Sequence, residues 1–485
     1  MVNLNFGSAA TMNGSFSAKR PNVYNNTVMH FAGPVGPLGN LSVFNNATAD
    51  FSPASGGPAT LNLSGLTLSS GGTLTGSDSF VDSGAFTWSG GTLSTPGLTV
   101  QGNATINDVN NTLDGTHLVT AGANNTWTST VHAGDGAIWD VPLSATLTAV
   151  QGGRNATLAN DVGNGVATLN NYGTITSQVG SGYGIIIVTA FQNYGAVTVA
   201  SGDFALGGGG TLNGGSSITG ANGSSFGFFG GSWTFAASSS IQGDLVNFNL
   251  GSAVTVNGTF QANQVNVYNN TTVTFTGTVI EQLGGLSQYG QIEVITGSLT
   301  LAGSLQIALV NGFVPRPGSQ FTIIDDQTSQ PINGAFTNLA RGGAIWDTSH
   351  TERFPITYIG GEGNDAVLTA TAPLTVKTNS SLMLVGNSPP PLTGTVNGTP
   401  FTGSITYTTA FGDQVTVTLG TAATAASAVG QYAITATLSG ANASNYFIDP
   451  TTSQTGTTYV VSLGVDPSGT GGLSVVFWDN KGTPS

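Results

Sequence analysis

Short runs of alternating apolar and polar residues recur along most of the chain. Residues 61–63 (LNL), 66–68 (LTL) and 98–100 (LTV) are typical, and Gly, Asn or Ser bounds each run. A period of two between turn residues predicts brief, half-buried strands, whereas helical periodicity over a full window is hard to find. Each strand is too short to bury a core alone. We therefore expect the strands to stack on the equivalent residues of the next unit.

Internal repeats support a stack. Residues 2–27 reappear without a gap at residues 246–271, with 17 identities in 26 positions, and the motif at 171–175 (NYGTI) returns at 193–197 as NYGAV. With turns of about 22 residues, the chain up to about residue 370 would form roughly seventeen turns. Because the first copy begins at Val2, we expect the sequence to begin inside a repeat array. An uncovered first turn would favour head-to-tail association.

Composition favours an ordered stack over a disordered Gly/Ser tract. The chain has 72 Gly in 485 residues, but hydrophobic residues make up 39% and the mean hydropathy is positive, so enough apolar surface is present to fold. Charged residues are only 6%, against about 25% in ordinary globular domains. Polarity must therefore come from Asn, Thr and Ser, which is typical of an extracellular β stack.

Charge and cysteine content exclude several classes of partner and site. The formal net charge is −14 and the eight basic residues are scattered, whereas phosphate binding needs clustered Lys and Arg, so we predict no nucleic-acid partner. There is no cysteine, which excludes disulfides and thiol chemistry. No apolar run approaches the length of a membrane span, and the first residues lack the basic segment of a signal peptide. If the protein is exported, we expect its export signal to lie outside this sequence.

The end of the repeat array resembles a known family. Its motifs are similar to the closing turns of the autotransporter-like and filamentous-haemagglutinin-like β-helices of large bacterial surface proteins. The resemblance implies a right-handed parallel β-helix over residues 1–372 that projects or adheres, and it carries no catalytic residues across. The motifs are GSLTLAGSL (297–305), VNGF (310–313), FTII (321–324), GAFTNL (334–339) and YIGGEGNDAVL (358–368).

A different pattern follows residue 372. Predicted strands at 374–377, 389–396, 414–419 and 430–438 resemble, in their order, the MBG modules, which are immunoglobulin-like β-sandwiches of bacterial surface proteins. The resemblance implies such a sandwich over residues 373–463. The chain has Val-Gly-Asn at 385–387 where members often have Tyr-Gly-Asp, but Gly386 still supplies the turn. Residues 464–485 are predicted to be an extra strand or a linker to a following module.

One segment matches a calcium-binding pattern. Residues 360–368 (GGEGNDAVL) fit the nonapeptide G-G-x-G-x-D-x-U-x, which makes Gly361, Gly363 and Asp365 candidate calcium ligands. Calcium needs six to eight oxygens and the nonapeptide occurs once, so one copy leaves the shell incomplete. The alternative is a Gly-rich turn between two strands. No other cofactor is predicted.

Catalysis requires convergent groups, and the sequence offers only candidates for them. Glycosidases need two carboxylates about 5–9.5 Å apart, and the companion motifs of pectin-cleaving β-helix enzymes are missing. We expect exposed turn aspartates and isolated histidines, and we predict that the protein is not an enzyme. The aspartates are Asp78 with Asp82, Asp108 with Asp114, Asp135 with Asp140 and Asp325 with Asp326, and the histidines are His30, His117, His132 and His350.

Aromatic residues supply the remaining binding hypothesis. Trp88, Trp127 and Trp233 recur along the predicted rod and could offer stacking platforms for sugar rings. The alternative is an inward ladder of aromatic rings aligned from turn to turn. The motif GAIWD occurs at 136–140 and again at 343–347, and reuse at two depths of a stack favours packing.

Together these features predict a non-enzymatic extracellular protein of the bacterial cell surface, an adhesin-like stalk or structural spacer. Its partners would be cell-surface or matrix glycans. One alternative is a self-assembling extracellular filament or matrix subunit, which would give long polymers of the pure protein. Another is a polysaccharide-active β-helix enzyme, which would turn over the sugar that it binds.

Overall fold

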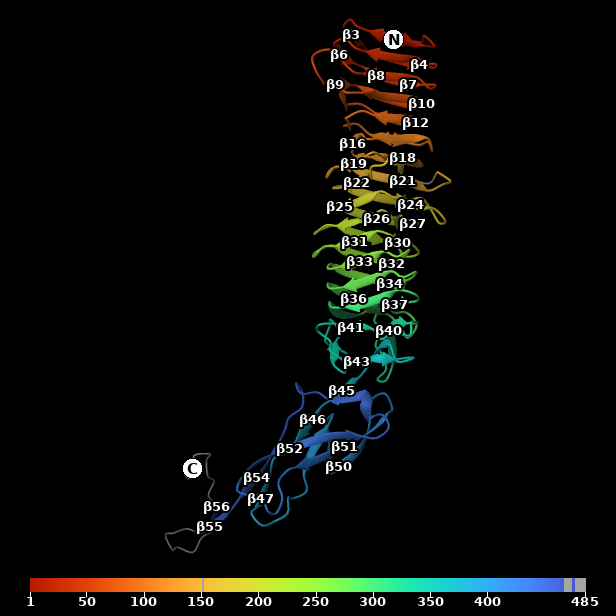
Figure 1. The fold of residues 1–485 in the computed structure, drawn as a ribbon. Coiled ribbons are helices and arrows are strands. Elements are labelled where there is room, and N and C mark those ends of the chain that lie inside the picture. Colours follow the sequence, from red (N-terminus) through yellow and green to blue (C-terminus); the bar gives the residue numbers. More distant parts are fainter. Residues whose placement is uncertain (151, 466–472, 476–485) are drawn as a thin grey trace.

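The computed structural model describes residues 1–150, 152–465 and 473–475 (Figure 1). Within these residues the protein is all-β, and its one helical element is a 3-10 turn, η1 (Ala443–Asn445). None of the described helical structure is long and apolar enough to cross a membrane. The chain forms an elongated β-solenoid of about 13 turns. A smaller C-terminal module, drawn in blue, lies at its end (Figure 1).

Solenoid strands pair in parallel with the strand at the same position of the next turn. Val2 pairs with Pro21 near the start of the chain, and Thr174 pairs with Ala196 near the middle of the rod. Parallel neighbours need a long crossover connection. Here the remainder of each turn supplies that crossover, so the strands fall into three rows that follow the long axis.

The first two rows belong to one 29-stranded sheet, which also includes three strands at the end of the solenoid. Four long strands bend around the corner and belong to both rows. The first row consists of β1 (Val2–Leu4), β4 (Pro21–Tyr24), β7 (Asn40–Phe44), β10 (Gly65–Gly76), β12 (Phe86–Ser94), β14 (Ala104–Ile106), β17 (Asn125–Trp127), β20 (Thr146–Val150), β23 (Thr174–Gln178), β26 (Ala196–Ser201), β29 (Ser217–Gly220), β32 (Ser240–Asn249), β34 (Thr259–Val267), β36 (Thr278–Leu283) and β39 (Ser304–Leu309). The second row shares β10, β12, β32 and β34 and adds β2 (Ala9–Met12), β5 (Val28–Phe31), β8 (Thr48–Phe51), β15 (Asn111–Asp114), β18 (Thr130–Gly134), β21 (Ala156–Val162), β24 (Gly184–Ile187), β27 (Asp203–Leu206), β30 (Ser225–Phe229), β37 (Gln291–Val294) and β40 (Gln320–Asp326).

The third row is a 13-stranded sheet with one strand per turn. Two strands of the first turns, β3 (Phe16–Ala18) and β6 (Val35–Leu38), pair with each other beside it. The sheet contains β9 (Thr60–Leu63), β11 (Ser79–Asp82), β13 (Gly97–Val100), β16 (His117–Thr120), β19 (Ile138–Val141), β22 (Thr168–Asn171), β25 (Ala190–Asn193), β28 (Gly210–Leu212), β31 (Ser232–Phe235), β33 (Ala253–Val256), β35 (Thr272–Phe275), β38 (Ser298–Leu301) and β41 (Asn333–Gly334).

The core is a continuous column of inward side chains. Alternation places every second residue inside, and the buried apolar residues from Leu4 to Ala370 form one cluster. Aromatic rings stack from turn to turn within it. The rings of Phe31 and Phe51 lie 4.3 Å apart and nearly parallel, and those of Phe228 and Phe248 lie 5.4 Å apart. The stack predicted from the short alternating segments is therefore confirmed.

Asn pairs explain several corners between rows. Asn25 and Asn26 both have positive φ, near 58°, and the Asn45-Asn46 pair repeats this conformation one turn later. Asn tolerates the left-handed region better than other residues with a Cβ. The Asn45 side-chain amide also donates to Asn25 Oδ1 at 3.1 Å, so the corner residues form a ladder. The repeated Asn-Asn dipeptide thus encodes a repeated bend.

The solenoid ends in antiparallel structure. Phe321 of β40 pairs with Leu368 of β44 (Asp365–Thr369), and β43 (Arg353–Gly360) pairs with both β44 and β42 (Ala344–Trp346). The expectation of roughly seventeen turns is corrected to about 13. After β41, which still pairs in parallel with β38, the chain folds back into β42, β43 and β44 instead of adding turns. Some turns are also longer than the expected repeat, such as the one that separates Gln264 from its pairing partner Gln291.

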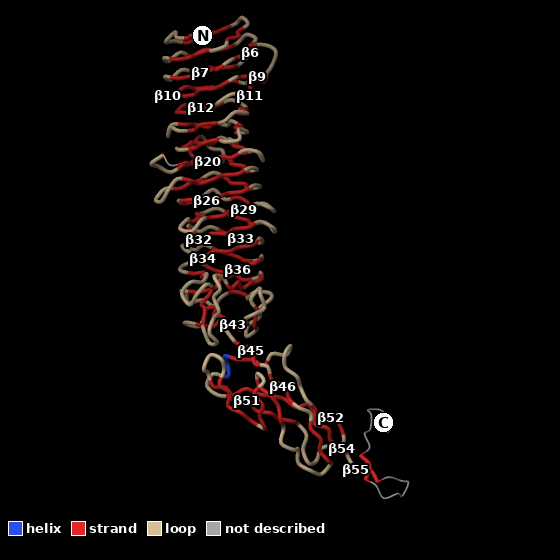
Figure 2. Tube along the Cα trace, turned by 180° about the vertical axis from the view of Figure 1, so that it is seen from behind, coloured by secondary structure: helices blue, strands red, loops and turns tan. Residues whose placement is uncertain are grey.

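The C-terminal module is an open half-barrel of mostly antiparallel strands. Figure 2 shows it beyond the solenoid, tilted from the long axis. Its strands surround a separate apolar cluster that includes Val376, Val396 and Val417. The predicted turn at Gly386 is present, with φ 90°. The strands are β45 (Ala372–Leu374), β46 (Val376–Thr378), β47 (Ser381–Leu384), β48 (Thr393–Val396), β49 (Thr399–Thr402), β50 (Ser404–Thr408), β51 (Gln414–Thr421), β52 (Gly430–Ser439), β53 (Tyr446–Ile448) and β54 (Thr457–Val461).

A short hairpin follows the module. β55 (Leu463–Val465) pairs antiparallel with β56 (Leu473–Val475). The remainder of the predicted extra strand or linker at 464–485 lies outside the described residues.

Candidate functional site

The three tryptophans considered as sugar platforms lie inside the solenoid. Trp88 and Trp127 are fully buried and Trp233 is 1% exposed. The indole N–H groups of Trp88 and Trp233 donate to Gly91 O and Gly230 O, and the ring of Trp127 meets Trp139 edge-on at 5.4 Å. None of these rings can present a face to a ligand at the surface. Residues alternate between inward and outward positions along each strand, and these tryptophans occupy inward positions. They form part of the inward aromatic ladder that was the alternative to a sugar platform.

The calcium-like segment forms a hairpin turn between β43 and β44. Gly361 and Gly363 have φ of 52° and 111°, which a residue with a Cβ rarely adopts. The Asp365 carboxylate is 5% exposed and its Oδ1 accepts the Asp326 backbone N–H at 3.0 Å. The Asn364 side chain donates to three backbone carbonyls of residues 326–330, so the turn holds that loop in place.

The Asp365 and Asp326 carboxylates at this turn already accept hydrogen bonds from backbone N–H groups, and a calcium site here stays a prediction. Burial raises the pKa of Asp365, and the neighbouring carboxylates of Asp325, Glu362 and Asp326 raise it further, although the Asp326 backbone N–H partly offsets them. One buried carboxylate that already accepts a backbone hydrogen bond falls short of the six to eight oxygens that calcium prefers. Among the described residues no group of three or more His, Asp or Glu side chains could hold a metal ion.

Two of the candidate catalytic aspartates, Asp78 and Asp82, accept hydrogen bonds from backbone amides. Asp78 binds Ala59 N at 2.7 Å and Asp82 binds Gly84 N at 3.0 Å. The expectation of exposed aspartates is wrong for these two, which are 3% and 0% exposed. Burial also raises the pKa of Asp82 above its ordinary range. Each carboxylate supplies the acceptor for a backbone N–H at a corner of the solenoid, because a buried N–H requires a hydrogen-bond partner.

Three of the four histidines pair with aspartates of the following turn, which the sequence analysis missed. The nitrogen–oxygen distance is 2.7 Å in each pair: His30 with Asp50, His117 with Asp140 and His132 with Asp161. Asp50 is the strand-pairing partner of His30 in the following turn. Asp140 and Asp161 instead lie two residues beyond the strand-pairing partners of their histidines. The only signal in the sequence was that the spacing within each pair lies close to one turn of the solenoid.

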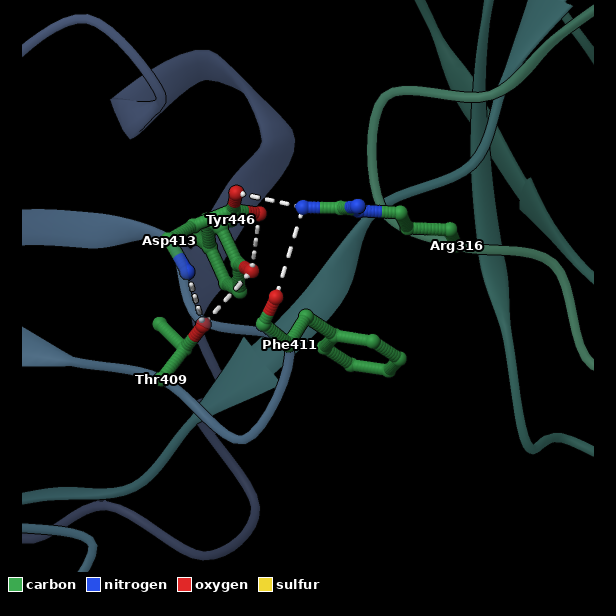
Figure 3. Close-up of polar contacts among 5 residues, drawn as sticks. All are labelled: Arg316, Thr409, Phe411, Asp413 and Tyr446. Atoms are coloured by element: carbon green, nitrogen blue, oxygen red, sulfur yellow. Dashed lines mark hydrogen bonds and ion pairs between the residues drawn. The ribbon is translucent and has the colours of Figure 1, made fainter.

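A polar network joins the solenoid to the C-terminal module (Figure 3). Arg316 belongs to the loop before β40, and its Nη2 lies 3.0 Å from Asp413 Oδ1 and donates to Phe411 O. Tyr446 O–H donates to the second carboxylate oxygen of Asp413, and Thr409 lies within hydrogen-bond distance of Tyr446. The Tyr446 hydrogen bond, followed by the Arg316 contacts, lowers the pKa of Asp413.

Aromatic contacts cross the same junction. The ring of Trp346, on β42, meets Phe447 of the module edge-on at 5.6 Å, and the Arg353 guanidinium lies over the Phe447 ring at 4.8 Å from its centroid. The repeated motif GAIWD therefore packs in two ways: Trp139 is fully buried in the solenoid, whereas Trp346 is half-buried against the module. The module is thus held by stacking as well as by charge.

An acidic turn lies beside this aromatic contact. Burial opposes ionisation of Asp347, but hydrogen bonds from the backbone N–H groups of Glu352, Ser349 and Thr351 outweigh it, so the pKa of Asp347 is lowered. Burial, followed by repulsion from Asp347, raises the pKa of Glu352 to about 7. An open groove of about 490 Å³ borders the turn. These contacts order the junction between the two parts of the chain.

Comparison with known proteins does not assign a family. No family model matches the chain, and no curated protein sequence matches it.

Proposed function

We propose that this protein is a non-enzymatic extracellular spacer of the bacterial cell surface, an adhesin-like stalk that carries a second module at its end. The observation that carries the proposal is the single apolar core that runs without interruption from Leu4 to Ala370. Stacked turns joined by one core resist bending and separation, because each strand pairs with the turns on both sides. The composition, with 6% charged residues and no cysteine, suits this setting.

Length is the property that such a rod controls. Successive strands lie about 4.8 Å apart, so about 13 turns hold the far module roughly 60 Å from the first turn. The contacts of Arg316 and Trp346 with the module fix its direction as well as its distance. A spacer needs both.

The finer structural assignment is also part of the proposal. We propose a right-handed β-helix of the autotransporter-like and filamentous-haemagglutinin-like kind, which the closing motifs and the three parallel rows support. We propose that residues 373–463 are an immunoglobulin-like MBG module. A three-stranded and a five-stranded sheet around a shared apolar cluster support that assignment.

Removal of one whole turn tests the spacer. Thr174 pairs with Ala196, so deletion of residues 174–195 joins Gly173 to Ala196 and keeps the register. The expected variant remains folded, and small-angle scattering shows a rod shorter by about 5 Å. A variant that unfolds throughout, with loss of the module as well, would contradict an additive rod.

Two further measurements separate the alternatives. A glycan array followed by a reducing-sugar assay distinguishes adhesion, with binding and no turnover, from a polysaccharide-active enzyme. Negative-stain images of the pure protein distinguish single rods from the long polymers of a filament or matrix subunit. Turnover that is lost on replacement of Asp78 or Asp135 would overturn the proposal.

A further inference from the structure

A polar groove lies at the corner between the first and second rows, lined by residues of β34 and β36 and of the loops that follow β29, β36 and β39. Its volume is about 530 Å³. Five side-chain amides line it, together with Tyr289 and Ser287. They belong to Asn222, Asn263, Gln282, Gln288 and Asn311.

The groove follows the long axis because its residues come from several neighbouring turns. Gly243 pairs with Ala262 and Leu245 with Gln264, which places Asp244 level with Asn263. In the next turn Phe260 pairs with Val279 and Gln264 pairs with Gln291, and Gln282 lies in the segment between these two partners. Polar groups from neighbouring turns, which are spaced about 4.8 Å apart, therefore meet in the groove.

An insertion builds one wall of the groove. Phe260 and Gln264 lie close together on β34, but their partners Val279 and Gln291 are much farther apart in the sequence, so the next turn carries extra residues at this corner. They form a tight loop in which Gly284 N donates to Gln288 O at 2.7 Å. Insertions in repeat proteins gather on one face, which is often the binding face.

The side-chain amide of Asn263 is held by a hydrogen bond within the protein. The other four amides that line the groove have no such hydrogen bond among the described contacts. Asp244 accepts hydrogen bonds from Asn263 Nδ2 and from Gly223 N, both at 2.7 Å, which leaves the Asn263 oxygen to accept from a ligand. Elsewhere on the solenoid, Asn side chains bond to one another, as Asn266 does to Asn247. The side chains of Gln282 and Gln288 make no hydrogen bond to other described residues, so their amides can bind a ligand.

One aromatic side chain, that of Tyr289, lines the groove. Tyr289 is half-buried, and its ring meets Phe321 edge-on at 5.4 Å, so packing fixes its position. An ordered ring beside several amides combines an apolar face with groups that both donate and accept. This is the chemistry that recognises hydroxyl groups on a ring with an apolar face.

We propose that this groove binds an uncharged oligosaccharide of about four sugar units that lies along the solenoid axis. The inference deepens the proposed extracellular role and rests on it, because an adhesin-like stalk meets glycans there. Among the described residues that line the groove, none has a charged side chain, and the net charge of −14 disfavours an acidic polysaccharide. An extended peptide fits less well, because its same-side groups repeat about every 6.6–6.8 Å, out of step with the turns.

The test measures binding of cellotetraose, maltotetraose and chitotetraose by calorimetry, with tetragalacturonate as the acidic comparison. The Gln282→Ala/Gln288→Ala variant should bind the preferred neutral sugar roughly ten- to a hundredfold more weakly, since it lacks two hydrogen-bonding groups. Gln101→Ala, at an exposed position far from the groove, should bind as the unmodified protein does. Asn222→Ala, on an exposed loop, provides a second groove variant if the double variant misfolds.

Three outcomes would overturn the inference. They are no binding of any neutral tetrasaccharide at millimolar concentration, equal weakening by the Gln101 control, and preference for tetragalacturonate or an extended peptide. Deletion of residues 174–195 does not touch the groove. Failure of sugar binding with normal shortening of the rod would therefore remove this site and leave the spacer function standing.

Discussion

The solenoid and the C-terminal module stabilise their strands in different ways. The solenoid pairs strands in parallel around one apolar cluster from Leu4 to Ala370. The module pairs most of its strands antiparallel, and its buried residues divide into three small clusters. In the solenoid each turn contacts only its neighbours, so stability is a sum of local contributions. The module instead depends on a few clusters and on its contacts with the last turns.

The two parts should therefore respond differently to a destabilising substitution. A defect in the solenoid should remain near the altered turn, because turns farther away keep their own neighbours. A defect at the junction should change the direction of the module without loosening either core.

Loss of a central aromatic ring tests the locality of the solenoid. Phe228 contacts Trp233, Phe235 and Phe248 through its ring. Phe228→Ala should lower the free energy of unfolding of the surrounding turns by about 3–5 kcal/mol, through lost burial and a cavity. Hydrogen exchange should increase in β30 to β33 and stay unchanged in the module. Faster exchange throughout the chain would show that the two regions unfold together.

A buried carboxyl gives the solenoid a pH dependence. Glu281 is 4% exposed and its Oε1 has no hydrogen-bond partner among the described residues. Burial raises its pKa well above the ordinary value of 4.5, and the Gly290 backbone N–H offsets this only in part. The folded state therefore keeps a proton that the unfolded chain releases. Stability from this group is fully present below about pH 4.5 and is lost as the pH rises toward the folded pKa.

Glu281→Gln should remove that loss. Between pH 5 and pH 8 the free energy of unfolding of the variant should rise, relative to that of the unmodified protein, by roughly 1 kcal/mol per pH unit until the pKa of Glu281 in the folded state is reached. Thermal unfolding at pH 5 and at pH 8 measures the difference in stability between the variant and the unmodified protein. Glu293→Gln, which changes a partly exposed carboxylate on β37, is the matched control. A gap that does not widen with pH would contradict a protonated Glu281 in the folded state.

Removal of the aromatic contact tests the junction. Phe447→Ala deletes the ring that meets Trp346 and lies beneath Arg353. The expected cost is about 1–2 kcal/mol of interaction between solenoid and module. Small-angle scattering should show a wider range of module directions, while the melting of the solenoid is unchanged. Leu382→Ala, at an exposed position on β47, should leave the scattering unaltered.

The ion pair of the junction should have the smallest effect. The Arg316 side chain is 63% exposed, so its pair with Asp413 is screened by water and salt. Arg316→Ala should weaken docking by less than about 1 kcal/mol. The difference from the unmodified protein should disappear at high salt. An effect as large as that of Phe447→Ala, and insensitive to salt, would mean that charge holds the module.

Much of the fold could be predicted from particular residues. The two NYG motifs predicted a repeated turn and strand, and Asn171 and Asn193 are buried in one ladder, joined at 2.7 Å. Tyr172 and Tyr194 stack outside at 4.7 Å. Strand alternation, Asn-Asn corners and the stacked core all follow from local preferences, because a two-residue period and a positive φ are properties of the chain itself.

The site was less predictable. The sequence favoured the core for tryptophans such as Trp88 but left a surface platform open, since only the inward direction of the strand position decides between them. The His30–Asp50 pair, the burial of Glu281 and the groove at Gln282 each depend on which residue lies one turn away. That neighbour changes with every insertion in a loop.

The sequence by itself therefore determined that the chain is an all-β repeat stack with a change of pattern near residue 372. The number of turns, the residues brought together across turns and the docking of the module were decided by tertiary structure alone. The physical reason is that the pleat fixes which side of a strand a residue occupies, whereas register fixes its neighbours, and register depends on loop lengths and packing over the whole turn.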